Sequence, residues 1–71
     1  MERFLRYSLE KERRIRAVLM LEGKLVQKPV TVLALEGGQV TLRLSAKRAP
    51  ITVPLDAIYS CDYARGDHGE E

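Results

Sequence analysis

This 71-residue chain is nearly without cysteine and histidine, with one of each, and contains neither tryptophan nor asparagine. A single cysteine excludes an internal disulfide framework and a zinc site built from paired Cys-x-x-Cys motifs. No uncharged run is longer than Pro29–Leu35, whereas a membrane-spanning helix needs roughly 20 apolar residues. The residues after Met1 also lack the apolar stretch of a secretion signal. We therefore expect a cytoplasmic protein that does not enter a membrane.

The composition is that of a folded domain, with 45% hydrophobic and 31% charged residues. A chain of this length forms one domain and buries only about 60% of its unfolded surface, which leaves no room for a large active-site cavity. The net charge of +2 is too small to imply a polyanionic partner by itself. The charges are unevenly distributed, however, because residues 1–28 hold eight basic and four acidic residues, and residues 29–71 hold four and six.

The spacing of Phe4, Leu5 and Leu9 predicts a short helix from Glu2 to Glu12, with Ser8 on the same side. From Arg14 onward the hydrophobic period changes from 3.6 to 2, which is typical of strands. The first strand is expected to end at a turn over residues 22–24. The remaining strands are expected over 27–35, 40–45, 51–55 and 58–63, with a tight turn at 36–39, a connection with a basic tip at 46–50 and a single helical turn at 54–58.

A small barrel is the predicted fold. In the third strand Val40, Leu42 and Leu44 are expected to face inward. A flat five-stranded sheet would expose two long edges, so closure is favoured, with the helix at an open end. We expect a mainly β fold with one N-terminal α-helix and a five-stranded antiparallel SH3/Sm-like small barrel. The domain is expected to span residues 1–63, followed by a polar, flexible C-terminal tail at 64–71. Pro29 is expected near the start of its strand or at an edge.

The order of these segments resembles the WYL domain, an Sm-like small barrel that is appended to many bacterial transcription regulators. The resemblance runs from Phe4 to Tyr63. It rests on the leading helix with its basic end and on three strand segments, Val30–Leu35, Gly38–Leu42 and Ile51–Ile58. The last of these is similar to the family's closing Phe-Arg-Leu-Asp-Arg-Ile pattern.

The chain also departs from the family pattern. Val40-Thr41-Leu42 stands where the family has Trp-Tyr-Leu, so only Leu42 matches, and Pro54 and Ala57 stand where the closing pattern has arginines. The resemblance implies binding of an anionic ligand or a nucleic acid. This chain lacks most of the basic and aromatic groups that would perform that binding in the family.

Basic residues gather in two places, at the end of the predicted helix and around the turn at 46–50. The first group either contacts phosphates or complements the helix dipole as a solvated helix end. The second group could join it only if the barrel brings both to one face. The residues predicted to bind a ligand or nucleic acid are Arg14, Arg16, Arg43, Lys47 and Arg48.

Four apolar residues fall on positions expected to face outward, namely Tyr7, Val18, Met20 and Tyr59. Single exposed apolar side chains are normal, but a cluster marks an interface. Small barrels also gain stability by association, since a core of this size supplies only about 3–5 kcal/mol. These four residues are therefore the predicted interface with a protein partner or a second copy.

Catalytic chemistry is not indicated. Cys61 would need a nearby base to act as a nucleophile, and the histidine, His68, lies in the predicted tail. The acidic residues around His68 lack the rigid support that a metal site requires. We expect no catalytic residues, no metal and no cofactor.

The sequence therefore predicts a non-catalytic cytoplasmic binding or regulatory module that acts through a protein partner or by forming a homo-oligomer. The alternative is that it binds a nucleic acid or an anionic nucleotide through a basic patch, as the resemblance would imply.

Overall fold

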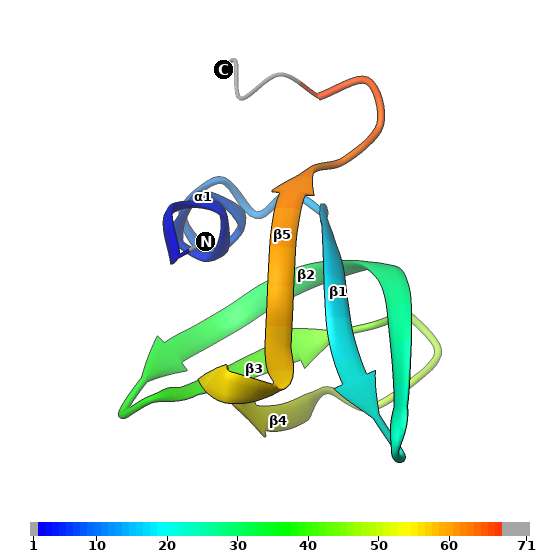
Figure 1. Cartoon of the computed structure of the whole chain (residues 1–71). Coiled ribbons are helices and arrows are strands. Elements are labelled where there is room, and N and C mark those ends of the chain that lie inside the picture. Colours follow the sequence, from blue (N-terminus) through cyan, green and yellow to red (C-terminus); the bar gives the residue numbers. More distant parts are fainter. Residues whose placement is uncertain (1, 68–71) are drawn as a thin grey trace.

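The computed structural model describes residues 2–67 of the chain. Its elements, in chain order, are α1 (Glu2–Lys11), β1 (Ile15–Leu21), β2 (Lys24–Glu36), β3 (Gln39–Arg43), β4 (Ile51–Pro54), the 3₁₀ turn η1 (Leu55–Ala57) and β5 (Ile58–Tyr63) (Figure 1). The five strands are all antiparallel and form one sheet in the order β4-β3-β2-β1-β5. The expected mainly β fold with one N-terminal helix and five antiparallel strands is confirmed.

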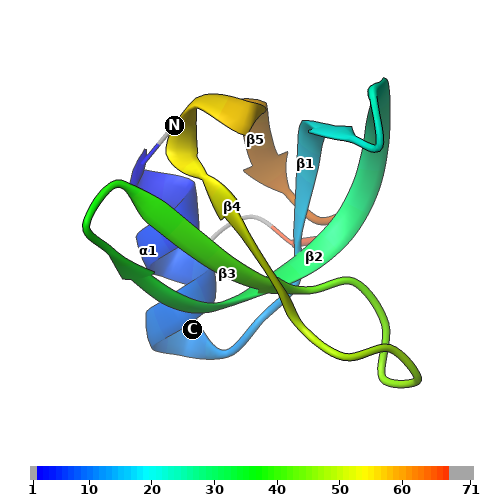
Figure 2. The ribbon, with the colours of Figure 1, turned by 90° about the horizontal axis from the view of Figure 1, so that it is seen from below.

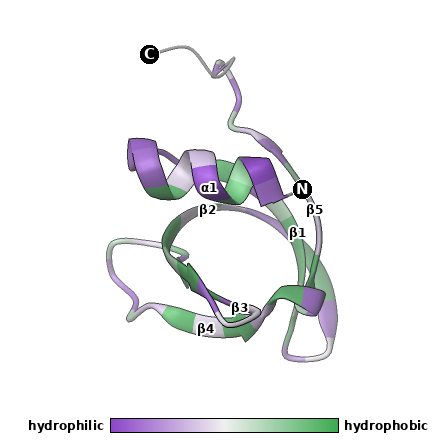
Figure 3. Cartoon of the chain, turned by 90° about the vertical axis from the view of Figure 1, so that its left-hand side faces the viewer, coloured by the Kyte–Doolittle hydropathy of each residue, from purple (hydrophilic) through white to green (hydrophobic). Residues whose placement is uncertain are grey.

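Helix α1 lies across one end of the curved sheet (Figure 3). Its apolar side chains pack against the sheet as predicted: Leu5 is fully buried, and Phe4 and Leu9 are half-buried against the core. The helix ends at Lys11 rather than at the predicted Glu12. Glu12 has a φ of 56°, a left-handed conformation that terminates an α-helix.

Ser8 fastens the helix to the sheet. Its hydroxyl accepts a hydrogen bond from the backbone N–H of Val32 at 2.9 Å and donates one to the carbonyl oxygen of Arg13 at 2.5 Å. The β2–β3 register shifts between Val32 and Ala34, so a β-bulge lies beside the amide that Ser8 accepts. Ser8 is completely buried, and both of its hydrogen-bonding roles are used.

Two tight hairpins join β1 to β2 and β2 to β3. Gly37 and Gly38 have φ values of 61° and 74°, as expected for the turn at residues 36–39. Glu22 and Gly23 also have positive φ values, 50° and 77°, so the first hairpin has the same two-residue left-handed geometry. Glutamate is an uncommon residue in that conformation.

Strand β2 is longer than predicted, because it starts at Lys24 rather than at Gln27. Its first half pairs with β1 and its second half, from Thr31, pairs with β3. Pro29 lies in the first half, opposite Arg16, where β2 has a neighbouring strand on one side only. This is the edge-like environment expected for a residue that cannot donate a backbone hydrogen bond.

The expectation of a closed barrel is wrong for the described residues. No ladder joins β4 to β5 in residues 2–67, so the sheet curves round but stays open between its two edge strands. The chain crosses this gap as η1, whose first amide, Leu55 N–H, donates to the carbonyl oxygen of Gly38 at 2.8 Å. Strand β4 has only four residues and ends at a proline, which leaves little backbone to pair with β5.

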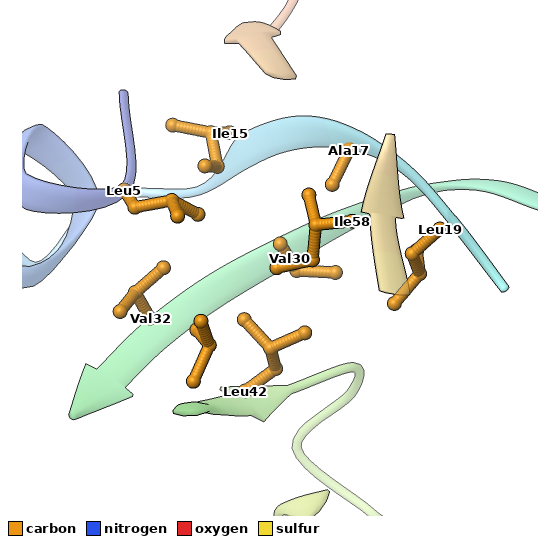
Figure 4. Packing of buried hydrophobic residues seen from close by; sticks show 9 residues of the cluster. Leu5, Ile15, Ala17, Leu19, Val30, Val32, Leu42 and Ile58 are labelled. Carbon is orange, nitrogen blue, oxygen red and sulfur yellow. The ribbon is translucent and has the colours of Figure 1, made fainter. Parts of the chain in front are cut away.

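The concave side of the sheet holds the core. Fully buried apolar side chains come from the helix and from four of the strands and converge on one interior (Figure 4): Leu5, Ile15, Ala17, Leu19, Val30, Val32, Val40, Leu42 and Ile58. The inward positions predicted for Val40 and Leu42 are confirmed. Leu44 differs, because β3 ends at Arg43 and Leu44 is half-buried at the start of the following connection.

Candidate functional site

The connection between β3 and β4, residues 44–50, lies on the side of the molecule away from α1, together with the tip of the β1–β2 hairpin (Figure 2). A turn holds the connection, since the backbone N–H of Lys47 donates to Ser45 Oγ at 3.2 Å and that of Arg48 to the Ser45 carbonyl at 3.3 Å. Two hollows border this connection.

The first hollow has a volume of about 470 Å³ and lies between the hairpin and the connection. Lys24, Val26 and Lys28 alternate along β2 on its core-facing side, where Lys24 is paired with Leu21 and Lys28 with Ala17. Val26 packs against the core and is half-buried, whereas the two lysines are exposed. The lining combines an aliphatic surface with three cations and one carboxylate: Leu21, Glu22, Lys24, Val26, Lys28, Leu44 and Arg48.

The second hollow has a volume of about 280 Å³ and lies on the other side of Leu44. Thr31 and Arg43 are cross-strand partners of β2 and β3 and face away from the core, unlike their buried neighbours Val30 and Leu42. Arg14 approaches from the segment between α1 and β1. The lining is Arg14, Thr31, Arg43, Leu44, Ser45 and Ala46.

Six exposed cations, three within residues 43–48 and three from the two hollows beside them, form what we call the basic loop surface: Arg14, Lys24, Lys28, Arg43, Lys47 and Arg48. Among residues 2–67 none of the six is in an ion pair. Glu22 is the one acidic residue that lines either hollow. Unpaired cations crowded together repel one another, and an anion placed between them relieves that repulsion.

The structure brings most of the predicted basic residues to this surface. Arg14 and Arg43 line the same hollow, Arg48 lines the other, and Lys47 lies on the connection. Arg16 is placed elsewhere, because its Nε donates to the carbonyl oxygen of Tyr63 at 2.9 Å and its guanidinium lies 3.4 Å from the Asp62 carboxylate.

Lys24 and Lys28 were not among the predicted site residues. The signal was present in the sequence as the alternation Lys24, Val26, Lys28, which places both lysines on one face of a strand. The predicted turn at 22–24 contains Lys24 and the predicted strand at 27–35 contains Lys28, so the prediction separates the two lysines and does not place them on one face.

An apolar patch lies on the outer face of the sheet. Val18 and Met20 lie on the outward positions of β1, and Met20 is directly opposite Leu25 of β2. Leu25 and Tyr59 are the two large hydrophobic residues that are exposed among those described, at 56% and 59%. Tyr59 occupies the bulge of β5 next to Val18. Three of the four predicted interface residues thus come together and Leu25 joins them.

Tyr7, the fourth, lies apart from this patch. Its ring meets Tyr63 edge-on, with centroids 5.1 Å apart, and its hydroxyl donates to Asp67 Oδ2 at 2.7 Å. Arg13 lies 3.7 Å from the same carboxylate. The hydrogen bond to Asp67 is the largest cause that raises the pKa of Tyr7 above its ordinary value. The first residues of the predicted tail therefore contact α1 through Asp67.

Cys61 is half-buried on β5, and its burial raises the pKa of the thiol, which disfavours the reactive thiolate. His68 lies outside the described residues. Within residues 2–67, no three His, Cys, Asp or Glu side chains are grouped so that they could hold a metal ion. No helix in this part of the chain is long and apolar enough to cross a bilayer.

Comparison of the chain with family models, with curated proteins and with solved structures gives no match. The proposed function therefore rests on the residues and geometry of this chain.

Proposed function

We propose that the chain is a non-catalytic binding module with an open, barrel-like fold of the SH3/Sm-like type, similar to a WYL domain, that binds a phosphate-bearing polyanion such as a nucleic acid through the basic loop surface. One observation carries the proposal: six exposed cations without ion-pair partners among residues 2–67 lie within or beside residues 43–48, and a single carboxylate lines the two hollows there. The order of one helix and five antiparallel strands, with β5 beside β1, supports the proposed fold type.

The small net charge of the chain does not reveal this local concentration of cations. Elsewhere three arginines are neutralised locally, in the ion pairs Arg6–Glu2, Arg13–Asp67 and Arg16–Asp62. Around residues 43–48 the cations are not neutralised, so the local field is positive although the whole chain carries only +2. Phosphate contacts by such exposed cations provide affinity by releasing counterions, and this affinity falls as salt is raised.

Fluorescence anisotropy with a labelled single-stranded oligonucleotide tests the proposal. We expect the double variant Lys47→Glu/Arg48→Glu to weaken binding by about tenfold, since each reversal replaces an attraction with a repulsion. The matched control is Arg3→Glu/Arg65→Glu, which changes the net charge equally at two exposed residues outside the surface. A dissociation constant weaker than about 10⁻⁴ M at low salt, or an equal loss in the control, would overturn the proposal.

The outer apolar patch favours a second candidate function, self-association. The exposed Leu25 and Tyr59 and the half-buried Val18 and Met20 form an apolar patch next to the edge of β5, which has no neighbouring strand on its outer side among residues 2–67. Contiguous exposed apolar residues mark interaction sites, and a second copy would cover both the patch and the strand edge.

Sedimentation equilibrium tests this second candidate. We expect the chain to dimerise at high micromolar concentration and the variant Leu25→Glu to be a monomer. The control Gln39→Glu adds the same charge at an exposed position of β3, away from the patch. A chain that is monomeric throughout, or a dimer that survives Leu25→Glu, contradicts it.

A further inference from the structure

The two hollows of the basic loop surface lie on different faces of the sheet. Lys24 and Lys28 are on the core-facing side of β2, whereas Thr31 and Arg43 are on the outward side. Leu44 is the one residue that lines both hollows. A single small anion would occupy one hollow and leave the cations of the other unused. A chain of anions that bends past Leu44 would use both.

The linings contain nothing on which a nucleobase could stack. Neither hollow has an aromatic lining residue among the described residues. Phe4, Tyr7 and Tyr63 pack against one another near α1, with Phe4 and Tyr63 centroids 4.9 Å apart, and Tyr59 lies on the outer apolar patch. Binding of single strands through their bases relies on aromatic platforms, so the recognition available here is that of the phosphates.

Because the hollows lie on different faces of the sheet, a ligand that fills both must be flexible. Duplex DNA behaves as a stiff rod with a persistence length of about 50 nm, and its phosphates cannot fold round the end of a sheet. A single-stranded polynucleotide bends freely and can follow the connection from one face to the other. Inorganic polyphosphate shares this flexibility and the same repeating charge.

On the basis of the proposed function, we infer that the basic loop surface binds a flexible linear chain of phosphates, such as single-stranded nucleic acid, across both hollows and without reading the bases. Arg14 and Arg43 hold one part of the chain, Lys24, Lys28 and Arg48 hold another, and Lys47 extends the track along the connection.

Competition for a labelled oligo-dT of about 12 nucleotides, within the roughly 4–16 nucleotides that one OB fold covers, tests this inference. We expect oligo-dA of equal length to compete within about twofold and inorganic polyphosphate to compete as well. A dinucleotide and a duplex of equal length should each compete at least about tenfold more weakly. A base preference above about tenfold, or a duplex that competes equally, would overturn the inference while leaving polyanion binding intact. Binding of none of the probes would instead contradict the proposed function itself.

Two double variants test whether both hollows take part. Lys24→Glu/Lys28→Glu changes the first hollow and Arg14→Glu/Arg43→Glu changes the second, with Arg3→Glu/Arg65→Glu again as the control. We expect each to weaken oligo-dT binding and to reduce the slope of log affinity against log salt by about 1.4, since each lost contact contributes about 0.7 for single strands. If only one double variant has this effect, the ligand occupies a single hollow and the inference fails. Circular dichroism confirms the fold, and the milder Lys24→Gln/Lys28→Gln or Arg14→Gln/Arg43→Gln replaces the matching charge reversal if that variant does not fold.

Discussion

At the scale of single residues, Ser8 is the one completely buried polar residue among residues 2–67. It serves two backbone groups at once, accepting from the Val32 amide and donating to the Arg13 carbonyl. Both groups would otherwise be left without a partner at the junction of helix and sheet. A serine in the apolar stripe of the predicted helix is therefore a structural requirement and not an interruption of the pattern.

We expect Ser8→Ala to lower the free energy of unfolding by about 1–3 kcal/mol, because it leaves a buried amide and a carbonyl unsatisfied. Urea unfolding measures the change. Ser60→Ala, at an exposed position of β5, is the control and should stay within about 0.5 kcal/mol of the unmodified chain. Equal effects of the two substitutions would show that the Ser8 hydrogen bonds do not hold the helix.

Tyr7 is expected to make the free energy of unfolding fall at alkaline pH. Its pKa is raised by the hydrogen bond to Asp67, so the folded state favours the protonated phenol. A group whose folded pKa is raised contributes stability that is fully present below the unfolded pKa of about 10 and is lost as pH rises through the folded value. Ionised Tyr7 would face the Asp67 carboxylate without a proton between them.

Unfolding measured from about pH 8 to pH 11 should therefore show a loss of stability above pH 10 in the unmodified chain that is smaller in Tyr7→Phe. The exposed Tyr59→Phe serves as the control, and it should follow the unmodified chain. If Tyr7→Phe and the unmodified chain lose stability in parallel, the contact between Tyr7 and Asp67 does not contribute at neutral pH.

At the scale of elements, the hairpin between β1 and β2 has a residue with positive φ at a position that belongs to the lining of the first hollow. Glu22 has a φ of 50° in a two-residue turn, where asparagine or glycine is preferred. It also provides the one carboxylate in the linings of the two hollows. Its backbone conformation reduces stability, and its charge opposes anion binding.

We expect Glu22→Asn to raise the free energy of unfolding by roughly 0.5–1 kcal/mol, part of the 1–2 kcal/mol cost of a left-handed residue. The same substitution should tighten polyanion binding, since it removes a negative charge from the first hollow. Thermal unfolding and anisotropy measure the two effects. Glu36→Asn, next to the other hairpin and outside the hollows, controls for charge. A destabilised Glu22→Asn would mean that the turn does not adopt this geometry.

The same elements show how far the sequence determines the fold. Paired glycines demand positive φ, so the turn at Gly37 and Gly38 was predictable, as was the two-residue alternation that buries Val40 and Leu42. The start of β2 was not, because lysines have weak strand propensity and the pairing of Lys24 with Leu21 depends on the neighbouring strand. The candidate site was found only in part for this reason.

At the scale of the whole molecule, the sheet remains open between β4 and β5 in the described residues. Closure depends on the length and relative position of two strands at opposite ends of the sheet, which alternation does not encode. The uneven charge distribution along the sequence pointed toward a basic surface. Which cations were neutralised by Asp62 and Asp67, and which were left free, required the three-dimensional arrangement.

The measurement that tests the account most directly is a titration of the ¹⁵N-labelled chain with inorganic polyphosphate, followed by two-dimensional NMR. We predict that shifts are confined to the amides of residues 14, 22–28, 31 and 43–48, and that 0.5 M salt reverses them. Residues 4–9 and 58–63 should not respond. Shifts centred on α1 or β5, or no shifts at low salt, would contradict the claim that the cations around residues 43–48 form the binding surface.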